Sequence, residues 1–159
     1  MIQQRLKGAK VVKALNHLDA PHLFIDARLH DKSNRTTLPI AGDDSEAKEA
    51  VMKFMDTVGY KGIDIGSLSE GWRMEPGTPI HVWPYGPRVP EELSGEEAQD
   101  WYQRTPGTPA SADQAKDLVA RAVRKFPVGG FPEYLPLFWL PSQQKTDGCR
   151  HDRQTSARC

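Results

Sequence analysis

The sequence of 159 residues carries 21 Lys or Arg against 21 Asp or Glu, and 38% of its residues are hydrophobic. This balance excludes the charge attraction on which binders of nucleic acid or anionic membranes rely, and no apolar stretch approaches the roughly 20 residues of a membrane span. The first residues lack the apolar core of a signal peptide, so we expect a cytoplasmic protein.

Residues 3–7 followed by Gly8 predict the last turn of a helix and its cap, and a strand and a second helix follow. A β-branched run at residues 10–15 predicts a short strand, and Asp19 with Pro21 close behind it is typical of a helix start. This helix is expected to reach about Leu29, and the polar residues 30–35 predict a loop.

A second strand and the clearest helix follow. Residues 36–40 predict a strand, which Pro39 assigns to a sheet edge or a strand end because proline has no amide hydrogen to donate. A helix is expected between Asp43, as its cap with Glu46 three residues on, and Gly59. Its apolar residues at helical spacing are Ala47, Ala50, Val51, Phe54 and Val58.

Residues 62–65 predict a third strand, so the order of elements is strand, helix, strand, helix, strand. Short apolar strands that alternate with helices indicate a parallel sheet with right-handed crossovers. We therefore predict an α/β fold of three layers, αβα, around a short parallel sheet.

The second half of the sequence is different in composition. Residues 76–110 are proline-rich and predict an extended arm, and Ser111 with Gln114 forms a capping box that starts another helix. Residues 131–140 are too apolar to be left in water, so they should pack on the domain or on another chain. Residues 142–159 are polar without periodicity and predict a disordered tail.

Two loops are candidate binding positions because each follows a predicted strand. Asn16 and His17 follow the first strand, and Gly66 to Leu68 follow the third. In open parallel sheets, ligands bind beyond the carboxyl ends of the strands. A cofactor would therefore lie near both loops.

Three stretches in this order resemble a known family: residues 11–18 (VVKALNHL), 38–60 (LPIAGDDSEAKEAVMKFMDTVGY) and 63–79 (IDIGSLSEGWRMEPGTP). They are similar to NADP-dependent oxidoreductases that use the deazaflavin coenzyme F-420, including dinucleotide-binding members without a characterised function. The resemblance implies a Rossmann domain, with NADP as cofactor and hydride transfer between the nicotinamide and a deazaflavin or related acceptor.

The resemblance also implies which residues meet the cofactor. Asn16 and His17 correspond to the loop beside the nicotinamide, and the motif that closes the Rossmann domain corresponds to Asp64, Gly66, Leu68 and Arg73. No catalytic acid or base is implied, since the cofactor carries the chemistry of hydride transfer.

The sequence departs from this family at the phosphate-binding half. No G-x-G-x-x-G follows an initial strand. The sequence therefore lacks the glycines that let backbone amides approach a pyrophosphate. We expect only the carboxyl-terminal half of the Rossmann-like domain here, either as a fragment of a longer reading frame or with a partner that supplies the missing half. An incomplete sheet exposes an edge, so we also expect a homodimer or such a partner.

Metal binding is not predicted. His17 and His22 lack a cluster of further ligands, and Cys149, His151 and Cys159 provide three candidate ligands where a closed structural site needs four.

Other polar residues have competing interpretations. Asp43 and Asp44 could form a carboxylate pair, but their place at a helix start favours capping. Asp64 lies within an apolar strand and needs a partner, either a backbone amide or a ligand. Arg73 is either an anion contact or a surface residue.

We therefore predict an NADP(H)-dependent oxidoreductase-family protein that is truncated, and the alternative is a catalytically inert remnant or protein-interaction module. The predicted organisation is a Rossmann-like half-domain, a proline-rich arm, a helix with an apolar segment, and a tail, over residues 1–75, 76–110, 111–141 and 142–159.

Overall fold

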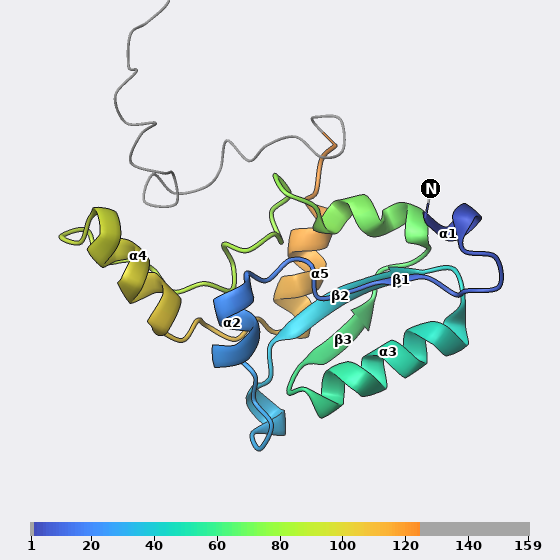
Figure 1. The fold of residues 1–159 in the computed structure, drawn as a ribbon, viewed down its shortest axis with the longest axis horizontal. Helices are drawn as coiled ribbons and strands as arrows, with labels where there is room; N and C mark the ends of the chain where they lie inside the picture. The colour runs from blue at the N-terminus through green and yellow to red at the C-terminus, as the bar shows by residue number, and fades with distance from the viewer. Residues whose placement is uncertain (1, 125–159) are drawn as a thin grey trace, which may run out of the picture.

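The computed structural model describes residues 2–124, which form a small α/β fold with a three-stranded sheet packed against helices (Figure 1). None of the helices in this range is long and apolar enough to cross a membrane. The predicted apolar segment and tail lie outside the described residues. In chain order the elements are α1 (Ile2–Arg5), β1 (Val12–Lys13), α2 (Ala20–Ile25), η1 (Lys32–Asn34), β2 (Thr37–Gly42), α3 (Ser45–Thr57), β3 (Lys61–Asp64), η2 (Leu68–Met74), α4 (Gly95–Arg104) and α5 (Ala112–Ala120).

The sheet is mixed, so the prediction that all three strands are parallel was wrong. β2 and β3 are parallel, with Leu38 opposite Gly62, but β1 is antiparallel to β2, with Val12 opposite Gly42. A parallel connection needs a crossover helix that covers the sheet. Between β1 and β2 the chain instead forms the short helix α2, which packs against α4, and it enters β2 from the opposite end.

β2 is the central strand, so the assignment of Pro39 to an edge was also wrong. The carbonyls of Thr36 and Ile40 accept bonds from β3, and the amide of Thr37 points the other way and donates to Ala110. By the alternation of a strand, Pro39 faces the same side as Thr37, beyond the end of the two-residue β1. Its missing amide hydrogen therefore costs no ladder bond.

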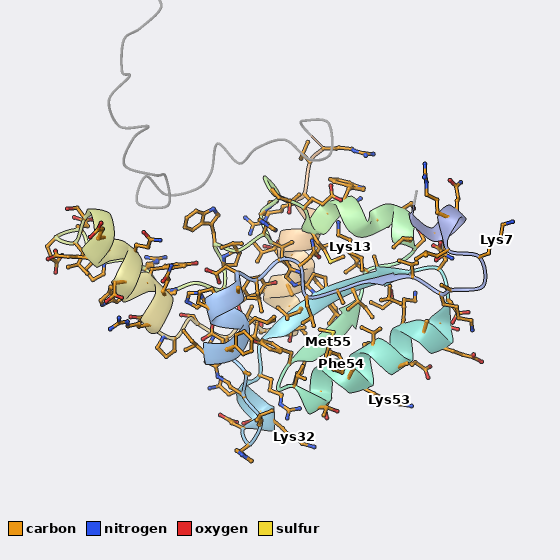
Figure 2. All side chains as sticks on the ribbon, in the orientation of Figure 1. Lys7, Lys13, Lys32, Lys53, Phe54 and Met55 are labelled. Atoms are coloured by element: carbon orange, nitrogen blue, oxygen red, sulfur yellow. The ribbon has the colours of Figure 1, made fainter. Side chains whose placement is uncertain are left out.

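Helix α3 covers one face of the sheet, and η2 and α5 pack on the other. Gly62 faces α3, where an added Cβ would lie 2.6 Å from the Cγ of Met52, while Ala41 faces Gly71 of η2. Met55 of α3 is fully buried, whereas its neighbour Phe54 is 55% exposed (Figure 2). The predicted inward position of Phe54 was therefore wrong, because the face that meets the sheet carries the methionines.

The proline-rich segment packs on the domain. Ile80 and Tyr85 are buried in the same core as the sheet residues, and residues 95–104 form α4. Gly107 holds this segment close: an added Cβ would lie 1.7 Å from the carbonyl oxygen of Tyr85, and its amide donates to the Asp26 carboxylate at 2.7 Å. No helix or strand occurs over residues 76–90, as the prolines predict.

Helix α5 begins as the sequence predicts. The Ser111 hydroxyl accepts from the Gln114 amide, and the Gln114 side chain accepts from the Ser111 amide, which completes the capping box. The helix ends at Ala120, earlier than its apolar pattern suggests.

Candidate functional site

The candidate site is the rim where β2 and β3 end together. β2 leads into Asp43, and β3 leads through Asp64 into Gly66, whose φ of +116° favours glycine. The Gly66 carbonyl accepts from the Gly42 amide at 3.1 Å, and the Gly66 amide donates to the Asp64 carboxylate at 2.9 Å. We call Asp43, Asp64, Gly66 and Leu68 the carboxyl rim.

Asp43 and Asp44 have separate structural roles. The Asp43 carboxylate accepts from the Leu68 amide at 2.8 Å and so ties η2 to the end of β2. The cap of α3 is Asp44, which accepts from the Ala47 amide at 2.8 Å, so the assignment of Asp43 as the cap was wrong by one residue. Each carboxylate thus has its own backbone partner, and the capping interpretation holds for Asp44 but not for Asp43.

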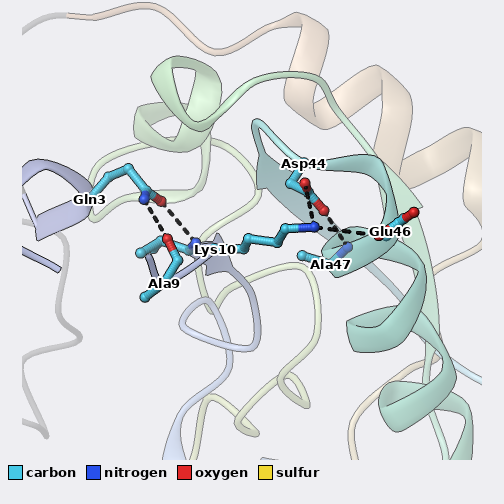
Figure 3. Close-up of polar contacts among 7 residues, drawn as sticks. Gln3, Ala9, Lys10, Asp44, Glu46 and Ala47 are labelled. Carbon is cyan, nitrogen blue, oxygen red and sulfur yellow. Dashed lines mark hydrogen bonds and ion pairs between the residues drawn. The ribbon is translucent and has the colours of Figure 1, made fainter. Parts of the chain in front are cut away.

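Two lysines pair with acidic side chains at and beside the carboxyl rim. Lys10 lies 2.8 Å from the Asp44 carboxylate and 3.4 Å from that of Glu46 (Figure 3). The Lys10 ammonium holds the pKa of Asp44 below its usual value. Asp64 lies 2.6 Å from the Lys48 ammonium. Partial burial acts to raise the pKa of Asp64, but Lys48 and the Gly66 amide outweigh it, so that pKa is lowered.

The capping role of Asp44 predicts a measurable loss of stability. In Asp44→Ala, the Ala47 amide loses its acceptor, and we expect the free energy of unfolding to fall by about 1 kcal/mol in urea denaturation. Glu49→Ala, an exposed substitution on the same helix, is the matched control and should change stability less. Equal effects of the two substitutions would contradict the cap.

Asn16 and His17 lie away from the carboxyl rim. Because β1 is antiparallel to β2, the loop after β1 reaches the amino end of β2, whereas Gly66 and Leu68 follow the carboxyl end of β3. Asn16 donates to the Met74 carbonyl at 3.4 Å, at the far end of η2 from Leu68. The structure therefore does not place the two predicted loops together.

His17 is fully buried, and neither ring nitrogen has a hydrogen-bond partner among residues 2–124. Its ring centroid lies 5.6 Å from that of Tyr85, and its carbonyl accepts from the Val82 amide. Burial lowers the pKa of His17 to about 3, and the charges of His81 and Lys13 act in the same direction. The imidazole is thus neutral and enclosed within the fold.

Arg73 has partners within the fold. Its guanidinium lies 2.7 Å from the Glu70 carboxylate and 3.5 Å from the carbonyls of Val119 and Ala122 at the end of α5. A cation is favourable at a helix carboxyl end, so this placement stabilises α5. The contacts favour the structural interpretation over an anion contact.

Lys48 was not predicted as the partner of Asp64. The available signal was the helical period, since Lys48 shares with Met52 and Met55 the face of α3 that meets the sheet. Within the described residues, no group of three His, Cys, Asp or Glu side chains could hold a metal ion. Cys149, His151 and Cys159 lie outside this range.

Comparisons with known proteins give little beyond this geometry. No family model matches the sequence, and no curated protein matches it significantly. One solved structure, a hypothetical protein SMa0349 from Sinorhizobium meliloti, is similar with 29% identity and a TM-score of 0.45. The match covers 51% of this chain and 39% of that protein, so the chain spans well under half of that protein's length.

Proposed function

We propose that the chain is the carboxyl-terminal half of an NADP(H)-dependent oxidoreductase domain, in which hydride passes between the nicotinamide and a deazaflavin or related acceptor. The observation that supports this best is the β2–α3–β3 unit, two parallel strands that end in one rim. Open α/β sheets bind ligands beyond such strand ends. Gly66, at a positive φ, adds no side chain to this rim.

The charge of the rim favours the nicotinamide end of the coenzyme. Asp43, Asp44 and Glu46 surround the start of α3, and the Asp44 carboxylate already accepts from the Ala47 amide there. A pyrophosphate would meet like charge here, so its binding is disfavoured. We therefore expect the phosphates to be held by a polypeptide outside these residues, because the sequence contains no G-x-G-x-x-G.

Titration of NADPH into the full chain, followed by nicotinamide fluorescence, tests this function. Because these residues hold no phosphate site, we expect weak but saturable binding, which Asp64→Asn weakens further by about tenfold, or about 1.4 kcal/mol. Asn16→Ala is the matched control, because Asn16 lies at the other end of β2 and should leave the affinity unchanged. Failure to see saturation would rule out coenzyme binding by this chain alone.

The second candidate is an interaction module without activity. It rests on Phe24 of α2, a residue that is 80% exposed, because aromatic side chains are enriched in interfaces such as one with a homodimer partner or with the polypeptide that supplies the missing half. This function predicts no saturable NADPH signal. Light scattering that finds a stable monomer at all concentrations would exclude the homodimer.

A further inference from the structure

The outer edge of β3 has no neighbouring strand among the described residues. The sheet order is β1-β2-β3, so β3 pairs on one side only. Lys61 and Ile65 donate their amides to the carbonyls of β2, and by alternation the amides of Gly62 and Asp64 point outward. These outward groups can accept a further strand.

A groove runs along this edge. It encloses about 320 Å³, and its lining includes Met52 of α3, Ile63 and Gly62 of β3, and Ala112 at the start of α5. α3 packs on β3 from one face of the sheet, and Ala112 at the start of α5 lines the groove from the other, so a strand placed here would meet both helices. Such a strand needs apolar side chains on both sides.

Residues 131–140 (FPEYLPLFWL), outside the described part, have the pattern that this groove requires. Read as a strand, Leu135, Leu137 and Trp139 share one face, and Tyr134 and Phe138 share the other, so both faces are apolar. Pro132 and Pro136 are both even-numbered, so their backbone nitrogens point to the opposite edge of the strand from the amides of the odd-numbered residues. If the odd-numbered residues pair with β3, both prolines lie on the outer side, where no amide is needed and where they block a further strand.

The connection is long enough for this segment to reach the groove. α5 begins at the groove with Ala112 and rises ~12 Å to Ala120. The described chain ends at Arg124, and residues 125–132 span up to ~26 Å when extended. The chain can therefore turn back to the groove from the far end of α5.

We propose that residues 133–139 add to the free edge of β3 as a fourth strand, in the groove between α3 and α5. The occupant is the chain's own segment, and the edge that it covers would otherwise be open to a second molecule. This proposal is independent of coenzyme binding.

Amide hydrogen exchange on the full-length protein, resolved by NMR, tests the fourth strand. We expect protected amides at Gly62 and Asp64, and we expect Leu137→Pro to reduce that protection by about tenfold or more, because it removes a ladder donor. Phe138→Pro is the matched control. It also removes an apolar side chain, but its amide would face outward, so it should retain more of the protection.

The outcomes separate the possible occupants. Rapid exchange at Gly62 and Asp64 in the unmodified protein would overturn the fourth strand, as would equal exchange in the two proline variants. Sedimentation on the same samples decides which molecule supplies the segment. Protection in a monomer supports the chain's own segment, whereas protection that disappears when a dimer is diluted would show a second copy in the groove and overturn the proposal.

Discussion

Replacing Arg35 with methionine is expected to lower the free energy of unfolding by about 2 to 4 kcal/mol. The Arg35 side chain is only 3% exposed, and its guanidinium donates to the carbonyls of Arg28 and Leu29 at 2.8 and 2.9 Å and to the Asp56 carboxylate. One side chain thus joins the loop before β2 to helix α3. Methionine fills much of the volume but leaves both carbonyls without these donors.

Urea denaturation of matched variants checks this expectation. Arg104 also pairs with an aspartate, Asp100, but it is 77% exposed, so Arg104→Met should change stability by no more than about 0.5 kcal/mol. Asp56→Asn keeps an acceptor beside the guanidinium and should fall between the two. If Arg35→Met were no more destabilising than Arg104→Met, the buried network would contribute little to stability.

Local signals in the sequence predicted local structure well. Asp19 and Pro21 mark the start of α2, Ser111 and Gln114 form the predicted capping box, and Gly59 ends α3 with a φ of +92°. Each of these features depends on residues within one turn of each other, so both partners of the interaction can be read from a short stretch of sequence. The assignment of an α/β fold rests on the same signals.

Long-range pairing was harder to predict. The two residues of β1 do not encode a direction, since side-chain alternation is the same in parallel and antiparallel pairs. The direction depends on the route of the chain between β1 and β2, and α2 in that connection packs against α4, a segment far along the sequence. This one reversal separates Asn16 from Gly66, and so it divides the predicted site into two places.

The burial of polar residues was also hard to predict from the sequence. Arg35 belongs to a polar stretch that predicts a solvated loop, yet its side chain is buried and donates to the carbonyls of Arg28 and Leu29. His17 belongs to a loop in which an exposed histidine is the ordinary expectation, but the proline-rich segment covers it with Val82 and Tyr85. Both outcomes depend on what packs over the residue, which no local pattern contains.

Acidification from pH 7 to pH 5 is expected to destabilise the protein through His17 by about 2 kcal/mol. The pKa of His17 is lowered from 6.5 to about 3 in the folded state, first by burial and then by His81 and Lys13. Between these two values the unfolded chain binds a proton that the folded chain does not. The free energy of unfolding therefore falls as the pH drops below about 6.5, by up to about 1.4 kcal/mol per pH unit, until about pH 3.

Urea denaturation at pH 7, 6 and 5, on the wild type and on His17→Phe, isolates this effect. Phenylalanine keeps the ring against Tyr85 and cannot bind a proton, so the stability of the variant should depend less on pH by the amount assigned to His17. Other groups contribute to both proteins and cancel in the difference. Substitution of the exposed His30 by glutamine is the matched control and should leave the slope unchanged. If His17→Phe kept the full slope, the imidazole would have to be reached by solvent in the folded protein, because only an accessible ring binds its proton in both states.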